Sequence, residues 1–472
     1  HDPSDPNSLS DRILWSIAQG PGGDIWFGTH SGILNRYRRK TRRFEVIEGV
    51  PVKNPGGRSN YIRSLVWDGE DRLWLTCAYS GLHIYDPSDG SCLRIFHDPD
   101  DPGSISDNRI RSIFRDRAGD MWICLTYGGL DHYDSRTGKF TNFSHDTGDS
   151  LSLSTNETIS MIEDSEGAYW LATKKGLNRI EFSRREKGVS IARIDRYYHD
   201  PADPRSLSDD YILTVLESRA GDVWIGSMQG LSRLSKADRA EKLFTRYLVK
   251  DGLPSSVIYG ILEDSRGKIW LSTNFGISCL DPKTEVFRNF DSRDGLHGNE
   301  FNTMTFCVTR EGTFIFGGVG GATEFHPDSL RESDFDAPVV LTGFDIFDEP
   351  ADLEQTISST EEIVLSHDEN YFSFEFASLD YSKPGANRYS YILEGLDRDW
   401  TDAGNRRFAG YTHVDPGRYT FRIRGTNSDG MWSSHTASVR IVITPPCWRT
   451  WWFVTMAALA AAGIIAWIII YR

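Results

Sequence analysis

Apolar and polar residues alternate in short runs along the first 330 residues, and the same pattern returns many times. In one copy, the run Ile269-Trp270-Leu271-Ser272-Thr273 lies between the turns Asp264-Ser265-Arg266-Gly267 and Asn274-Phe275-Gly276. Aromatic and β-branched residues between such turns predict antiparallel hairpins, with Gly where the backbone needs a positive φ. Each copy therefore predicts a series of short antiparallel strands.

The spacing of the copies predicts the architecture. One repeat contains four predicted strands, at Ile110–Arg115, Met121–Leu125, Leu130–Tyr133 and Phe140–Ser144. The tryptophan of the second strand returns at intervals of 46 to 54 residues, and Ile315 replaces it in a seventh copy; the tryptophans are Trp26, Trp74, Trp122, Trp170, Trp224 and Trp270. Four strands in such a period predict a propeller blade and exclude solenoids of helix pairs. We therefore expect a seven-bladed β-propeller over residues 1–330.

The last repeat is predicted to lack its outer strand. After Thr323-Glu324-Phe325 the chain leaves the repeat pattern without a fourth strand. The first residues, His1-Asp2-Pro3, match the residues that follow the fourth strand elsewhere, as in His97-Asp98-Pro99 and His199-Asp200-Pro201. We expect the last blade to take three strands from this chain, and its outer strand to lie just upstream of His1.

A second all-β region follows over residues 336–444. Its runs Tyr371–Phe376, Tyr389–Leu393 and Tyr419–Arg424 alternate with a period of two but do not repeat at the propeller spacing. About 110 residues of such strands predict an immunoglobulin-like β-sandwich. The whole fold class is therefore all-β, a propeller followed by a sandwich.

One C-terminal segment has a different composition. Residues 450–471 contain no charged side chain, and tryptophans flank the start of the segment at Trp448, Trp451 and Trp452. About 20 apolar residues in a helix span a ~30 Å hydrocarbon core, and tryptophan favours the membrane interface. We predict a single transmembrane helix over residues 448–471; a buried helix of a soluble protein is the alternative interpretation.

Composition excludes several functions. The net charge of −15 argues against nucleic acid as a partner, because phosphate binding needs clustered Lys and Arg. The six cysteines form no Cys-x-x-Cys pair, and the chain has no phosphate loop, no His-Glu-x-x-His and no Gly-x-Ser-x-Gly. We therefore expect no catalytic residue, no metal ligand and no cofactor within this chain.

The repeats resemble a known family. Glu163–Thr173 and Asp222–Gly226 resemble the two-component-regulator propeller repeat, and Asp294–Asn302 is similar to the last-blade signature of that family. The following segment resembles its triple-tyrosine domain, with Tyr389-Ser390-Tyr391 and Pro416-Gly417-Arg418-Tyr419 in place. Relatives commonly carry two propellers, whereas this chain has seven repeats.

The resemblance implies a function. It implies the extracytoplasmic sensor region of a hybrid two-component sensor histidine kinase that responds to a carbohydrate, with residues 1–447 in the periplasm and one helix in the bacterial inner membrane. The kinase would lie in a cytoplasmic region outside this chain, so no enzyme activity is expected here. A sensor for a diguanylate cyclase and a propeller that docks proteins remain alternatives. Because a lone helix transmits a signal by moving relative to another, we also expect a homodimer.

One face of the propeller is predicted to bind the ligand. Strands alternate in direction, so the links between blades and the turns between second and third strands emerge on the same face. Aromatic planes and polar donors at these positions suit a small molecule or an oligosaccharide. The candidate ligand-binding residues are His30, Tyr61, Tyr79, Arg109, Tyr127, Lys174, Tyr211, Met228, Tyr259 and Asn274. An alternative is that they only line the channel or contact a second propeller.

Overall fold

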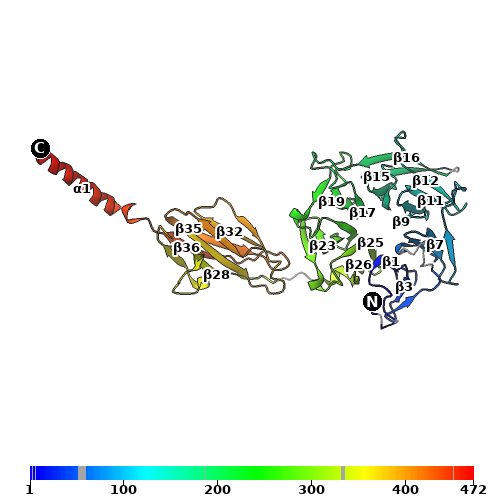
Figure 1. Cartoon of the computed structure of the whole chain (residues 1–472), viewed down its shortest axis with the longest axis horizontal. Helices are drawn as coiled ribbons and strands as arrows, with labels where there is room; N and C mark the ends of the chain where they lie inside the picture. The colour runs from blue at the N-terminus through cyan, green and yellow to red at the C-terminus, as the bar shows by residue number, and fades with distance from the viewer. Residues whose placement is uncertain are drawn as a thin grey trace. The chain divides into compact units, whose positions relative to one another are not determined.

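The chain folds into two compact units, His1–Leu330 and Arg331–Arg472. The computed structural model describes residues 1–2, 4–5, 7–50, 60–185, 188–330, 335–449 and 451–471. The first unit is a propeller of seven antiparallel sheets, and Figure 1 shows them arranged around a centre, with β1, β9, β17 and β25 among the innermost strands. The seven-bladed architecture predicted from the sequence is confirmed.

Six blades have four strands and the seventh has three. Blades 1 to 3 are β1 (Leu14–Gln19), β2 (Ile25–Thr29), β3 (Leu34–Arg38), β4 (Arg43–Val46); β5 (Ile62–Trp67), β6 (Leu73–Cys77), β7 (Leu82–Tyr85), β8 (Cys92–Ile95); β9 (Ile110–Arg115), β10 (Met121–Leu125), β11 (Leu130–Asp134), β12 (Lys139–Phe143). Blades 4 and 5 are β13 (Thr158–Glu163), β14 (Tyr169–Thr173), β15 (Leu177–Arg185), β16 (Gly188–Tyr197); β17 (Ile212–Glu217), β18 (Val223–Ser227), β19 (Gly230–Leu234), β20 (Thr245–Tyr247). Blades 6 and 7 are β21 (Ile258–Glu263), β22 (Ile269–Thr273), β23 (Gly276–Asp281), β24 (Val286–Phe290); β25 (Phe301–Val308), β26 (Phe314–Gly318), β27 (Gly321–Phe325). Short 3-10 turns follow the last three blades at η1 (Val249–Asp251), η2 (Ser292–Asp294) and η3 (Pro327–Ser329).

A carboxylate in the first turn holds the repeated tryptophan in four blades. The indole of Trp122 donates a hydrogen bond of 2.9 Å to Asp116, six residues earlier. The same contact joins Asp68 to Trp74, Asp164 to Trp170 and Asp264 to Trp270, at 3.1, 2.9 and 3.0 Å. Trp122 and Trp170 are fully buried. A buried indole N–H needs an acceptor, so the turn both closes the hairpin and satisfies the core residue.

A histidine fixes the link that leads into several blades. Nδ1 of His97 lies 2.7 Å from the carbonyl of Ile105, eight residues later, and His145 and His199 make the same contact at 2.6 Å. His1 repeats this contact with Leu9, also at 2.6 Å. The chain therefore begins in the conformation that follows an outer strand in other blades.

The ring closes between blades 1 and 7. Ile13 forms a β-bridge with Val319, and the amide of Asn302 donates to the carbonyl of Leu14 at 2.7 Å. In blade 7, β27 pairs with β26, and no other strand in the described part of the chain pairs with it. The prediction of three strands in the last blade is thus confirmed, whereas the origin of a fourth strand stays a prediction.

The second unit contains a two-sheet sandwich. One sheet has the order β29-β28-β31-β34 and the other β30-β36-β35-β32-β33. The rings of Phe374 and Phe421 stack 4.1 Å apart between the sheets, and the hydroxyl of Tyr389 accepts a hydrogen bond from the Ser378 amide. Its elements are β28 (Val339–Ile346), β29 (Glu349–Pro350), η4 (Ile357–Ser359), β30 (Glu362–Leu365), β31 (Tyr371–Ser378), β32 (Tyr389–Glu394), β33 (Thr401–Gly404), β34 (Phe408–Thr412), β35 (Gly417–Gly425) and β36 (Ala437–Ile443). The predicted sandwich is confirmed.

A single α-helix ends the described chain. After η5 (Cys447–Arg449), α1 extends over Trp451–Ile470 without a charged residue, and none of its side chains is buried against protein. By length and composition it is able to cross a membrane, and it is the one such helix among the described residues. Thr450, included in the predicted segment, lies outside the described residues.

Candidate functional site

The innermost strand of every blade carries a β-bulge at the same place. In β5 the ladder passes from Ile62 to Ser64 while its partner advances by one residue, so Arg63 is the extra residue. The equivalent extra residues are Trp15, Arg63, Arg111, Ile159, Leu213 and Tyr259, and residues 302–305 in blade 7. A bulge residue is released from the ladder and its side chain is re-aimed. We call this set the bulge ring.

Several members of the bulge ring meet at one small cavity. It measures about 20 Å³ and is lined by Trp15, Arg63, Arg111, Ile159, Thr303 and Met304. These residues come from five different blades, so the cavity lies where the inner strands converge. Met304 has φ of 60°. A non-glycine residue in the left-handed region is strained, and such strain is concentrated at functional sites.

The face around the bulge ring is built by one recurring backbone contact. The residue after the second strand donates its amide to the carbonyl just before the first strand, as from Ala78 to Tyr61 and from Thr126 to Arg109, at 3.0 and 2.8 Å. The same contact joins His30 to Ile13, Lys174 to Glu157 and Met228 to Tyr211. This contact brings the link that enters each blade and the turn between its second and third strands to the same face.

Blades 1 and 2 form an aromatic cluster on this face. The Tyr61 ring lies 4.9 Å from that of Trp15 and 5.4 Å from that of His30, stacked in both pairs. The Trp15 indole donates to Nδ1 of His30 at 3.1 Å, and the guanidinium of Arg63 lies 4.8 Å from the centre of the Tyr61 ring. The cluster joins predicted residues (His30, Tyr61) to bulge-ring residues.

Blades 3 to 5 contribute two cation–aromatic pairs. Arg109 forms an ion pair with Asp107 at 2.8 Å and lies 4.6 Å from the centre of the Tyr127 ring. Lys174 forms an ion pair with Glu157 and lies 5.6 Å from the centre of the Tyr211 ring. Because the carboxylates neutralise these cations, the pairs present flat aromatic surfaces with polar edges rather than strong positive charge.

The remaining predicted residues are dispersed. Tyr79 is 40% exposed and Tyr127 53% exposed. Met228 packs against the core shared by blades 4 and 5, and Asn274 accepts a hydrogen bond from Ser255. Tyr259 belongs to the bulge ring itself, and burial raises the pKa of its hydroxyl. The ten predicted residues are therefore spread over several blades in separate groups.

Sequence reasoning missed Trp15, Arg63 and Arg111. They recur at intervals of 48 residues, the same interval as the first tryptophans of the repeat. That interval marks them as equivalent positions. Their orientation toward the axis depends on the bulge, which the alternating pattern does not reveal.

Family comparisons agree with this architecture. The family model "Two component regulator propeller" matches residues 104–127 and 252–275, and the Y_Y_Y domain model matches residues 380–444. The chain thus contains matches to two-component-regulator propeller repeats, followed by a match to the Y_Y_Y domain. The predicted family is thus confirmed.

Individual relatives of this propeller and Y_Y_Y domain were also found. Histidine kinase P4 of Formosa agariphila is 29% identical over 296 residues, which are 61% of this chain and 21% of that protein. The chain thus spans about a fifth of the length of this relative. The extracellular domain of a protein described as a hybrid two-component system of B. thetaiotaomicron is 21% identical, with a TM-score of 0.45 over 92% of this chain and 73% of that one. PorZ, a surface component of the type-IX secretion system of Porphyromonas gingivalis, has the same fold at 13% identity, with a TM-score of 0.53 over 94% of this chain and 61% of that one.

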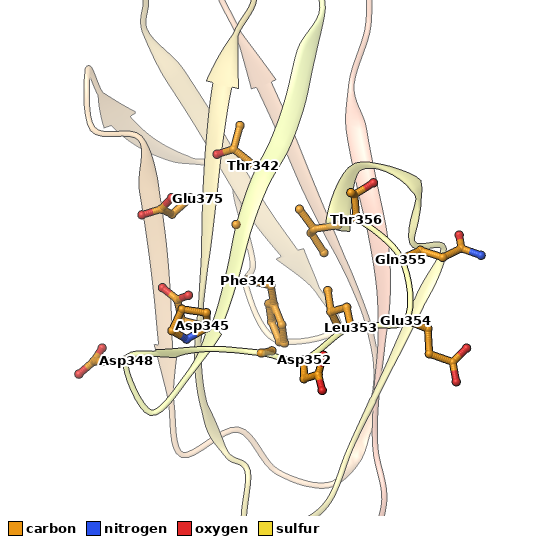
Figure 2. Close-up of a pocket in the computed structure, with 14 residues that line it drawn as sticks. Thr342, Phe344, Asp345, Asp348, Asp352, Leu353, Glu354, Gln355, Thr356 and Glu375 are labelled. Carbon is orange, nitrogen blue, oxygen red and sulfur yellow. The ribbon is translucent and has the colours of Figure 1, made fainter.

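The sandwich that contains the Y_Y_Y match has an acidic groove. It measures about 700 Å³ and lies between β28 and the segment 350–357. In the view of Figure 2, Asp345, Asp348 and Glu375 lie on one side of Phe344 and Glu354 on the other. Within the described ranges, no three His, Cys, Asp or Glu side chains are grouped as a metal site requires.

Proposed function

We propose that this chain is the extracytoplasmic sensor region of a membrane-bound bacterial receptor, and that the propeller face around the bulge ring binds a carbohydrate. The observation that carries the proposal is the stack of Trp15, Tyr61 and His30 beside the cation–aromatic pairs of Arg109 and Lys174. Binding sites for small molecules combine apolar and aromatic walls with a few placed polar groups. The aromatic cluster and the two cation–aromatic pairs supply both on one face of the propeller.

The rest of the receptor is proposed from the order of the parts. A propeller, a Y_Y_Y domain and one apolar helix suit a single-pass protein of the inner membrane with residues 1–447 in the periplasm. The name of the relative from Formosa agariphila supports a histidine kinase as the output, with a diguanylate cyclase as the alternative. Signalling by such a receptor would involve a homodimer.

Docking of a protein on the same face is the second candidate. The exposed rings of Tyr79, Tyr127 and Phe275 favour it, because aromatic side chains are enriched in protein interfaces. A protein partner would use these outer rings, whereas a sugar would also use the inner cluster of Trp15 and Tyr61.

Calorimetry with a panel of oligosaccharides tests the proposal. The full chain in detergent micelles is compared with the double variant Tyr79→Ala, Tyr127→Ala, and with Tyr381→Ala as a control, since Tyr381 is an exposed tyrosine of the sandwich. We expect at least a tenfold loss of sugar affinity in the double variant at unchanged Tm, and no loss in the control. Unchanged affinity in the double variant would exclude the outer rim as part of the sugar site.

A further inference from the structure

We propose that Arg63 and Arg111 form an anion-binding site on the propeller axis, which takes a carboxylate or sulfate group of the ligand. The proposal rests on the carbohydrate-sensing function above and specifies the chemical class of the sugar. It adds two residues that contact the ligand, both from the bulge ring.

Geometry brings the two arginines to one place. Each is the extra residue of a bulge, in β5 and β9, and the two positions are 48 residues apart in adjacent blades. Both line the same cavity of about 20 Å³. Since neither residue takes part in the ladder, each guanidinium is directed by its bulge toward the axis.

Neither arginine is neutralised by the protein. Among the described residues, Arg63 and Arg111 form no ion pair, and their hydrogen-bond acceptors are the hydroxyls of Tyr61 and Tyr211, the latter at 3.3 Å. The Nε atom of Arg63 is buried and has no hydrogen-bond partner. Two other half-buried arginines of this acidic chain do have carboxylate partners: Arg36 has Asp24 and Arg233 has Asp222.

Two partly buried cations without a counter-ion are costly unless something compensates them. A carboxylate or sulfate supplies that compensation, because the guanidinium fork donates paired hydrogen bonds to either group. The contrast with Arg109 supports the selection of these two residues, since Arg109 lies on the same face but is paired with Asp107.

The size of the cavity limits what enters it. A volume of about 20 Å³ holds about one water, so a sugar ring does not fit there. Only the anionic substituent is expected to point into the cavity, while the ring to which it is attached lies on the Trp15 and Tyr61 surface. The ligand class is therefore an acidic saccharide, with a uronic-acid carboxylate or a sulfate ester directed to the axis.

The test compares charged and neutral probes on the full chain in detergent micelles. The probes are trigalacturonate, galactotriose, sodium glucuronate and sodium sulfate, and affinity is measured by calorimetry at two salt concentrations. The variants are Arg63→Gln, Arg111→Gln and the double variant. Arg136→Gln is the control, because its side chain is 80% exposed in a turn of blade 3.

We expect trigalacturonate to bind at least tenfold more tightly than galactotriose, and each axial variant to lose at least tenfold in affinity for trigalacturonate. The control should bind like the unmodified chain. The axial variants should keep or raise Tm, because each removes an uncompensated charge, and this separates loss of binding from loss of folding.

Three results would overturn the proposal. In the first, the double variant binds trigalacturonate as tightly as the unmodified chain does. In the second, sulfate is the one anionic probe that binds, as an adventitious ion only. In the third, no anionic probe binds. If galactotriose binds as tightly as trigalacturonate and the axial variants leave both affinities unchanged, the anion site is wrong while carbohydrate sensing stands. If neither trisaccharide binds but glucuronate does so through the two arginines, the anion site stands and the oligosaccharide part of the proposal fails.

Discussion

At the scale of single residues, stability depends on a few buried carboxylates that each satisfy several donors. Asp116 accepts hydrogen bonds from the Trp122 indole at 2.9 Å and the Tyr169 hydroxyl at 3.0 Å, and pairs with Arg184. Burial alone would raise the pKa of Asp116, but the bonds from Trp122 and Arg184 outweigh it and hold the pKa below its usual value. The charged carboxylate is therefore the form that the fold stabilises.

Replacing this carboxylate should weaken the propeller. Asp116→Asn removes the negative charge beside Arg184 and leaves one acceptor oxygen for the donors of Trp122, Tyr169 and Arg184. We therefore expect the free energy of unfolding, measured with urea, to fall by about 2 kcal/mol. Asp134→Asn is the control: Asp134 pairs with the exposed Arg136, and a change of less than about 0.5 kcal/mol is expected. A similar loss in both variants would contradict the special role of Asp116.

A buried histidine should make stability depend on pH. His83 is fully buried, and burial lowers its pKa from 6.5 to about 4. Between pH 6.5 and 4 the unfolded chain therefore binds a proton that the folded chain does not, so stability falls as pH falls through this window, by up to ~1.4 kcal/mol per pH unit. His83→Gln should reduce that slope in urea titrations.

The control for the pH experiment is His413→Asn. His413 is exposed and has φ of 56°, a conformation that Asn tolerates. This variant should keep the slope of the unmodified chain. An unchanged slope in His83→Gln would show that the loss of stability at low pH has another origin.

The sequence predicted part of the arrangement of this face at the residue scale. Alternation of strand direction was sufficient to place Tyr61, Arg109 and Lys174 on one face. It was insufficient for Arg63 and Arg111, because the bulges that re-aim these side chains are defined by pairing with the neighbouring strand, which a pattern along one strand does not show. Tyr259 shows the same limit, since it was predicted for the rim and lies in the bulge ring.

At the scale of elements, the outer edge of β27 is open in the described structure. Beside it lies a cavity of about 140 Å³ whose lining includes Trp270, Phe290, Phe325 and Leu330. In blade 3, Phe140 of the outer strand packs into the apolar core that contains Trp74 of the preceding blade. A strand paired with β27 would place an apolar side chain in the equivalent cavity.

Supplying that strand should stabilise the propeller. We suggest fusing a copy of residues 139–144 directly ahead of His1, because those residues precede His145 in blade 3 and His1 has the conformation of His145. Burial of one phenylalanine favours folding by about 2 kcal/mol, which corresponds to a rise of roughly 2–4 °C in Tm. A matched fusion with both phenylalanines replaced by Asp should give no rise, and equal Tm values for the two fusions would argue against pairing at this edge.

Strand positions were largely predictable, whereas short helical turns were not. In blade 3 the first two strands have the predicted bounds, and the last two differ by one residue at their ends. Period-two alternation fixes strands of five or six residues well. The turn η2 (Ser292–Asp294) has no such period, since it depends on local capping by Asp291 and a left-handed Gly295.

At the scale of the whole molecule, signal transfer would depend on the connector between the sandwich and α1. Pro445 and Pro446 follow β36 after one residue, Thr444, and proline restricts the backbone. In the full-length receptor, insertion of Gly-Ser-Gly-Ser after Pro446 should leave ligand affinity unchanged and abolish ligand-dependent output. The same insertion after Gly385, in an exposed turn of the sandwich, is the control and should preserve output. A fully responsive connector variant would exclude a rigid connection.

The bulge ring has a consequence for the evolution of such propellers. Its residues contribute side chains to the axis but lie outside the regular ladders, so exchanging them breaks no paired backbone hydrogen bond. Each blade thus offers one replaceable side chain, while the Asp–Trp turns preserve the scaffold around it. A propeller built in this way can change the side chains on its axis through a handful of substitutions spaced one repeat apart, without altering the strand pairing of its blades.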